Sequence, residues 1–250
     1  MQYHVLASGS KGNATFVYEH GTGILIDCGI TKKQLRYKLN QLGFSENDID
    51  YVLLTHDHYD HKKNIHTFDP DIVYTAKGNI DDLDEEHELQ VYETYQFGCF
   101  EVTVLRLSHD ATNTIGFIIR GDESLLYMTD TGYVSQRNRQ MISDLNYYII
   151  EANHDVQMLM NTRRPLFLKN RILSDTGHLD NEYSAKLMVR MIGPHTKDIV
   201  LAHLSEEANT PELALKTYNY IFDRYGIAFD RTHIRTAHQV MVCSGGHKDD

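Results

Sequence analysis

Three histidines and two aspartates crowd into one short segment of the chain, Thr55-His56-Asp57-His58-Tyr59-Asp60-His61. The segment follows the apolar stretch 51–55, which predicts a buried strand. Alternate residues of an extended or tightly turned segment project the same way, so His56 and His58 can hold one metal ion while Asp60 and His61 turn toward a second. The bland alternative is a hydrophilic surface loop. The HxHxDH pattern instead predicts a fold in which a buried strand ends at a metal site.

Three further residues of ligand type each follow an apolar strand. His109 follows residues 102–108, Asp130 follows 124–129 and His203 follows 199–202. Taken alone, each is better explained as a turn residue or a satisfied polar residue of the core than as a metal ligand. Taken in order after the first segment, they predict the rest of a two-metal shell, in which an aspartate bridges ions roughly 3.5 to 4 Å apart.

Length and composition restrict the class of protein. A chain of 250 residues with 41% hydrophobic and 24% charged residues favours one large α/β domain, which we expect at residues 1–243, with a disordered tail at 244–250. The net charge of −11 argues against non-specific coating of nucleic acid. No apolar run approaches the roughly 20 residues of a membrane span, and no secretory signal is visible, so we expect a cytoplasmic protein. The cysteines, at positions 28, 99 and 243, are too far apart to suggest disulfides.

Hydrophobic periodicity predicts many short strands with helices between them. The predicted strands are 3–7, 14–18, 23–27, 51–55, 72–75, 89–95, 100–107, 114–119, 124–128, 147–151, 198–202 and 234–242. The predicted helices are one that contains Leu35, Leu39 and Leu42 before a Gly43 cap, and those at 135–145, 156–160, 181–192 and 211–225. This order predicts a layered α/β fold, with two mixed β-sheets packed face to face and helices outside.

The ordered ligand set resembles the metallo-β-lactamase superfamily along essentially the whole chain. The resemblance implies an αββα sandwich that hydrolyses its substrate with two divalent metal ions, zinc first, with manganese and iron left open. It places Asp27 beneath the histidine loop, in a position that holds it, and makes Asp60 a catalytic residue. The metal ligands that it implies are His56, His58 and His109 on the first ion, Asp60, His61 and His203 on the second, and Asp130 as the bridge.

The sequence differs from several other branches of the superfamily, and these differences restrict the activities that the resemblance implies. His58 stands where redox di-iron relatives carry glutamate, which favours hydrolysis, and true β-lactamases usually lack a residue like His61. Only 72 residues separate Asp130 from His203, too few for the inserted domain of the β-CASP nucleases.

A closer resemblance is to the WalJ (YycJ) family of bacterial metal-dependent nucleases. It rests on residues 6–13, 130–134, 151–155 with Met158-Leu159, and 177–181 followed by 202–205. The resemblance implies an exonuclease that acts on double-stranded DNA, with a role in DNA repair. Asp180 stands where the family usually has serine, and it can still cap the next helix.

Several residues near these segments are candidates for substrate contacts. Ser10 and Asn13 lie on a Gly-rich loop that either contacts phosphate or simply makes a tight turn. His178 either protonates a leaving group, holds a phosphate or caps a helix. Asn153 and His154 either line the cleft or have a structural role, and His154 is a catalytic candidate. The basic run Arg163, Arg164, Lys169 and Arg171 either binds substrate phosphates or forms a solvated helix face.

Two other functions remain open from the sequence. One is a small-molecule phosphodiesterase or thioesterase of the same fold, since fold does not fix function. The other is a non-catalytic regulatory protein that the metal stabilises. Comparing the cleavage of DNA with the cleavage of small esters distinguishes a nuclease from the first alternative. Binding of a partner without any cleavage identifies the second.

Overall fold

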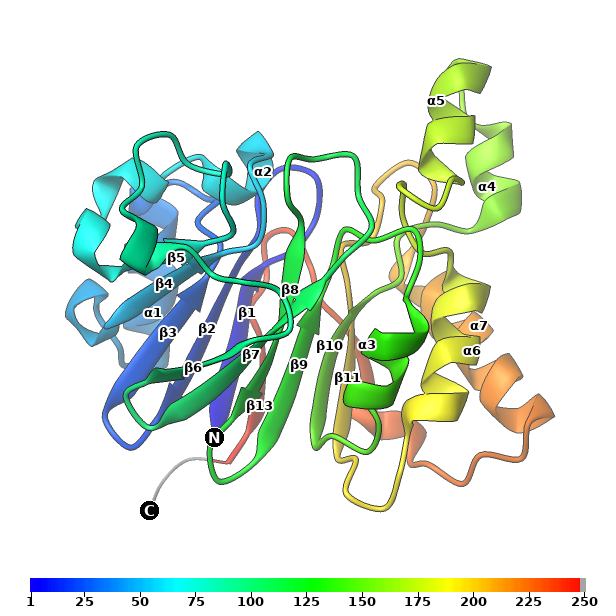
Figure 1. Cartoon of the computed structure of the whole chain (residues 1–250). Helices are drawn as coiled ribbons and strands as arrows, with labels where there is room; N and C mark the ends of the chain where they lie inside the picture. Colours follow the sequence, from blue (N-terminus) through cyan, green and yellow to red (C-terminus); the bar gives the residue numbers. More distant parts are fainter. Residues whose placement is uncertain (248–250) are drawn as a thin grey trace. The chain divides into compact units, whose positions relative to one another are not determined.

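The computed structural model describes residues 1–247, and Figure 1 shows their course in chain order. The chain divides into two compact units. Unit 1 comprises Met1–Arg106, Ala111–Glu123 and the C-terminal segment from His238, and unit 2 comprises Leu107–Asp110 and Ser124–Ala237. The single domain expected at residues 1–243 remains a prediction.

Unit 1 contains a mixed six-stranded sheet in the order β13-β1-β2-β3-β4-β5. Its strands are β1 (Gln2–Ala7), β2 (Ala14–Glu19), β3 (Thr22–Ile26), β4 (Tyr51–Leu54), β5 (Val73–Thr75) and β13 (Cys243–Gly246). The first three pair antiparallel, whereas β3, β4 and β5 run parallel. Parallel strands end at the same edge of a sheet, so the residues that follow β3 and β4 lie near each other.

Helix α1 (Lys32–Leu42) covers this sheet through its apolar stripe. Leu35 and Leu39 are fully buried and pack in one core cluster with Phe16 and Leu25 of the sheet. A capping box begins the helix, and Gly43, with a φ of 88°, ends it. Both the helix and its glycine cap agree with the expectation from sequence.

Unit 1 also carries the short helix α2 (Tyr59–Lys62) and the antiparallel strands β6 (Thr94–Phe97), β7 (Phe100–Arg106) and β8 (Ile115–Arg120). The predicted strand 89–95 is therefore wrong over most of its length. Tyr92 has a φ of 70°, a left-handed conformation that breaks the alternation of a strand. One-turn 3-10 helices of unit 1 occupy Glu46–Asp48, Ile65–Thr67, Pro70–Ile72 and Glu85–His87, and unit 2 has one at Arg231–His233.

Unit 2 contains four parallel strands, β9 (Ser124–Met128), β10 (Tyr147–Glu151), β11 (Asp198–Ala202) and β12 (Ile234–Thr236). Its helices are α3 (Gln136–Met141), α4 (Val156–Asn161), α5 (Leu166–Ile172), α6 (Asn181–Met191) and α7 (Pro211–Arg224). Strands β6 to β12 belong to the second mixed sheet of the fold, β6–β8 from unit 1 and β9–β12 from unit 2. The predicted fold class, two mixed sheets with helices, is thus confirmed.

Some predicted elements differ from the structure for local reasons. Helix α3 stops at Met141 instead of 145, because Asp144 adopts a left-handed φ of 55° that a helix cannot contain. The predicted strand 234–242 is two strands, β12 and β13, joined by a segment in which Val240 accepts a hydrogen bond from Lys38. Residues 244–246 of the expected disordered tail pair with β1, and the last tail residues, 248–250, lie outside the described part of the chain.

Helix α5 has no counterpart among the predicted elements. It starts directly after Pro165 and is only seven residues long, so its apolar periodicity is too short to detect. In contrast, Asp180 does cap α6, accepting hydrogen bonds from the backbone N–H groups of Glu182 and Tyr183. No described helix has the length and apolar character that crossing a membrane requires.

Candidate metal centre

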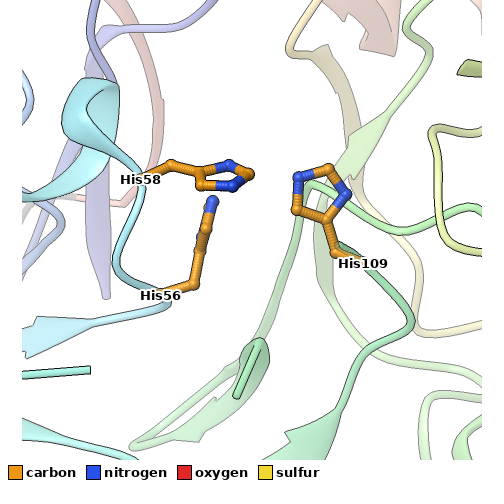
Figure 2. A group of neighbouring side chains, drawn as sticks. All are labelled: His56, His58 and His109. Carbon is orange, nitrogen blue, oxygen red and sulfur yellow. The ribbon is translucent and has the colours of Figure 1, made fainter. Parts of the chain in front are cut away.

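The loop between β4 and α2 carries the histidines of unit 1. Figure 2 draws His56 and His58 on this loop, together with His109, which follows β7. The centroid of the His56 imidazole ring lies 4.7 Å from that of His58 and 4.1 Å from that of His61. Since β4 delivers His56 fully buried, the cluster sits at the end of the sheet and not on a solvated loop.

Asp27 anchors this histidine loop from the end of the neighbouring strand β3. Its carboxylate accepts hydrogen bonds from the backbone N–H of Thr55 at 2.8 Å and from the Thr55 hydroxyl. It also lies 2.7 Å from Nδ1 of His61. A Nδ1–H donated to a carboxylate fixes the tautomer of the ring and leaves the lone pair on Nε2, as in metal sites where an outer carboxylate orients a histidine.

The Gly-rich loop before β2 holds the other side of the histidine loop. The backbone N–H of Asn13 donates to the Asp60 carbonyl at 2.8 Å, and its amide Nδ2 lies 3.0 Å from Nε2 of His61. Gly29 is required nearby, because a Cβ there would lie 1.6 Å from the Asp60 carbonyl oxygen. Asn13 is therefore buried against the predicted ligands, whereas Ser10 is exposed.

Unit 2 presents its donors at the ends of parallel strands. The register pairs Met128 with Ile150 and Glu151 with Ala202, so the residues that end these strands fall at one edge. Ligand atoms of four residues lie within 4.8 Å of one another: Asp130, Glu151, His178 and His203.

Three of the predicted site residues share an unusual backbone conformation. Asp27, Asp130 and His203 have φ values of 60°, 58° and 54°. Left-handed conformations are uncommon for residues with a side chain, and they concentrate at functional sites. Asp27 and His203 directly follow β3 and β11, and Asp130 comes two residues after the end of β9, so each of the three lies in the turn that ends a buried strand.

Glu151, the last residue of β10, is a member of this cluster that reasoning from sequence left without a role. Its fully buried carboxylate lies 2.7 Å from Nδ1 of His178 and 3.0 Å from Nδ1 of His203, and it accepts from the backbone N–H groups of Thr131 and Leu179. Burial acts to raise the pKa of this carboxyl, but the two imidazoles outweigh it and hold the pKa well below its usual range. A charged residue closing the buried run 147–151 was the signal in the sequence.

His109 lies in the same unit, three residues after the end of β7. Its Nδ1 lies 3.0 Å from the carbonyl oxygen of Gly177, and its Nε2 lies 3.9 Å from a carboxylate oxygen of Asp130. Burial lowers the pKa of His109, which favours the neutral imidazole that binds metals.

His178 and two of the predicted basic residues line one cavity of about 170 Å³. Arg164 and Arg171 form its wall together with His109, and Arg171 is paired with Asp110. Gly177 lets the His178 loop pack on α5, since a Cβ there would lie 2.2 Å from the Ile172 carbonyl oxygen.

The remaining basic residues have other positions. Lys169 is buried, and its ammonium donates to the carbonyl oxygens of Met160 and Thr162, so it ties α5 to the end of α4. That pairing supports a structural role for Lys169 in place of the predicted phosphate contact. Arg163 is exposed to solvent.

Asn153 and His154 also separate in the structure. The amide of Asn153 donates to the carbonyl oxygen of His203 at 2.8 Å, so it positions a predicted ligand. His154 is 1% exposed and lines a cavity of about 660 Å³ beside α6 and α7. None of the predicted metal ligands lines that cavity, and burial lowers the pKa of His154.

The donors fit divalent metal ions. Imidazole nitrogens and carboxylate oxygens are the ligands that zinc, manganese and iron accept, and in both units a buried carboxylate orients the imidazoles through Nδ1. Asp27 does so in unit 1 and Glu151 in unit 2. Through Nδ1 Asp27 thus orients the imidazole of His61, and Glu151 orients those of His178 and His203, which leaves Nε2 of these rings suited to a metal.

Comparisons with known proteins agree with this chemistry. Residues 22–204 match the family described as "Beta-lactamase superfamily domain". The chain is 35% identical over 231 residues to "Exodeoxyribonuclease WalJ" of Streptococcus pneumoniae strain D39, covering 86% of each chain. It is 35% identical over 240 residues to "Exodeoxyribonuclease YycJ" of Bacillus anthracis, covering 90% of each.

Solved structures show the same fold. The metallo-β-lactamase fold protein YhfI from Bacillus subtilis superposes with a TM-score of 0.72 at 16% identity, over 98% of each chain. The short form of human tRNase Z gives a TM-score of 0.63 at 17% identity, over 97% of this chain and 98% of the other. The resemblance seen in the sequence is confirmed: the chain has the metallo-β-lactamase fold and belongs to the β-lactamase superfamily, within the family of the WalJ and YycJ exodeoxyribonucleases.

Proposed function

We propose that the chain is a metal-dependent exodeoxyribonuclease that removes nucleotides from the ends of double-stranded DNA in the cytoplasm and takes part in DNA repair. Membership of the WalJ and YycJ family supports the reaction, because the alignments cover 86% to 90% of those relatives. The observation that carries the proposal from the structure is the carboxylate and imidazole cluster at the strand ends of unit 2.

We propose two divalent metal ions as cofactors, zinc first, with manganese and iron as alternatives. The ions would supply water of lowered pKa and would neutralise charge on the phosphoryl oxygens. The order of the ligands along the chain and the family fold support the assignment. The proposed ligands are His56, His58, Asp60, His61, His109, Asp130 and His203, with Asp130 as the bridge.

The other residues of the site orient these groups and the substrate. Asp27 and Glu151 hold imidazoles through Nδ1, and Asn13 holds the loop that bears Asp60. His178 is 19% exposed and has its Nδ1 on Glu151, which leaves Nε2 to protonate a leaving oxygen or to steady a phosphate. Arg164 takes part in the wall beside it, where a phosphodiester would be attracted.

The test offers the purified chain, loaded in turn with zinc, manganese or iron, four substrates. These are end-labelled double-stranded DNA, single-stranded DNA, RNA and a chromogenic phosphodiester. We expect stepwise shortening of double-stranded DNA, two metal ions per chain by elemental analysis, and loss of both in Asp130→Ala. Asp122→Ala, at an exposed carboxylate in a turn, serves as the control and should keep both.

Other results would contradict the proposal. Cleavage of small esters without cleavage of any nucleic acid would favour a small-molecule phosphodiesterase or thioesterase. A metal-loaded chain that cleaves nothing but holds a partner would favour a regulatory protein. Full activity and metal content in Asp130→Ala would remove the bridging role of that residue.

A further inference from the structure

The segment Val156–Ser174, which we call the basic arm, has a charge unlike the rest of the chain. It contains Arg163, Arg164, Lys169 and Arg171 and no acidic residue, although the whole chain has a net charge of −11. Helices α4 and α5 make up most of the arm and lie side by side in Figure 1. The Lys169 ammonium joins them by donating to the carbonyl oxygens of Met160 and Thr162. The arm is therefore a folded cationic element and a candidate for binding a polyanion.

One side of the basic arm adjoins the candidate site. Arg164, Leu168 and Arg171 line the 170 Å³ cavity that His109 and His178 also line. The backbone N–H of His178 donates to the carbonyl oxygen of Ile172, in the last turn of α5. A nucleic acid bound along the arm thus reaches the residues that act on the phosphodiester.

The tip of the arm exposes apolar side chains to water. Phe167 is 74% exposed and Leu166 is 62% exposed, both in the first turn of α5 directly after Pro165. Neither side chain belongs to the small core cluster in which Leu159 and Ile172 of the arm pack with Ala208. Exposed aromatic groups among cations are the arrangement that stacks on nucleobases while the cations bind the flanking phosphates.

We infer that Phe167 stacks on the exposed face of the terminal base pair of a DNA duplex, so that the basic arm selects DNA ends. The inference rests on the proposed function and adds how the end is recognised. At the end of a duplex an aromatic ring can stack on a base pair without separating it from a neighbour, whereas insertion between internal pairs costs the unstacking of a base step. A second copy of the chain is a poorer occupant, because the arm carries cations and no acid of its own, so two arms offer each other no opposite charge. Arg164 and Arg171 pair with Glu207 and Asp110 outside the arm, and Arg163 is exposed.

The test compares binding of two short duplexes of the same sequence to the metal-loaded protein. One duplex has open ends protected by phosphorothioate linkages, and in the other both ends are closed by covalent linkers. Phe167→Ala should weaken binding of the open duplex by about five-fold or more, the range expected for losing one stacked base, and leave binding of the closed duplex unchanged. Phe167→Trp should restore it. Tyr37→Ala, at a 62% exposed aromatic on helix α1, is the matched control and should have no effect.

A second readout follows the stack directly. A 2-aminopurine placed at the terminal position should be quenched by the unaltered protein and less by Phe167→Ala, while hydrolysis of a chromogenic phosphodiester is the same for both. Equal affinity of Phe167→Ala and the unaltered chain for the open duplex would overturn the inference, and so would a change of oligomeric state with DNA binding intact. Because binding is measured apart from cleavage, a chain that cleaves no DNA would refute the proposed function without deciding this result.

Discussion

Replacing Glu151 by glutamine should damage the site of unit 2 without changing the volume of the side chain. Glu151→Gln can keep the oxygen that accepts from the backbone N–H groups of Thr131 and Leu179, which lie 3.1 Å away. Its amide then replaces the oxygen that faces Nδ1 of His178 at 2.7 Å and Nδ1 of His203 at 3.0 Å. The Nδ1–H groups of His178 and His203 would then face the N–H group of the new amide, three donors without an acceptor between them, in a fully buried position.

The magnitude follows from the two hydrogen bonds that are lost. Hydrogen bonds to a charged group contribute about 1.5–3 kcal/mol each, so the free energy of unfolding of the metal-free protein should fall by about 3–6 kcal/mol. The rings can escape the clash by moving their protons to Nε2, but His203 then loses the lone pair that we propose for the metal. Metal affinity should therefore fall by about 10- to 100-fold, as for other residues that orient a ligand.

Two assays check this prediction. Urea unfolding of the metal-free chain gives the change in stability, and competition with a chromogenic chelator gives the change in metal affinity. Glu182→Gln is the matched control, because that carboxylate is exposed and pairs with Lys186 on the surface of α6. Glu151→Gln with stability within about 1 kcal/mol of the unaltered protein and unchanged metal affinity would refute the reasoning, since the mean effect of any substitution is of that size.

Two further changes test other parts of the structure. Gly29→Ala should lower the free energy of unfolding by about 1–3 kcal/mol or more, because its Cβ would meet the Asp60 carbonyl oxygen at 1.6 Å. A stable variant with normal metal content would show that the histidine loop does not need the close contact between Gly29 and Asp60. Burial, aided by the charge of Asp27, raises the pKa of the Cys28 thiol from 9.0 to about 12, so the folded state holds this proton more tightly than the unfolded state. The resulting stabilisation is complete below pH 9 and should decline by about 1.4 kcal/mol per pH unit between pH 9 and 12. Unfolding of Cys28→Ala, compared with the unaltered chain across that range, measures the decline, and parallel stability curves for the two would contradict the assigned pKa.

The sequence alone was sufficient for the features that repeat at short range. Apolar runs predicted most strands within a residue or two, and the stripe of α1 with its Gly43 cap appeared where the spacing placed them. Another short-range pattern, an apolar strand followed by a residue of ligand type, identified Asp130 and His203 as candidates. These signals survive in one sequence because backbone geometry sets their periods.

Only the tertiary structure decided which side chains meet. Glu151 joins His178 and His203 because parallel pairing aligns the ends of β9, β10 and β11, and no spacing along the chain encodes that register. The tertiary structure also separated basic residues that the sequence had grouped. Lys169 caps α4, whereas Arg164 and Arg171 line a cavity beside His178. A sequence records which groups are present, whereas hydrogen-bond partners and burial depend on contacts between residues far apart in the chain, and these exist only after it has folded.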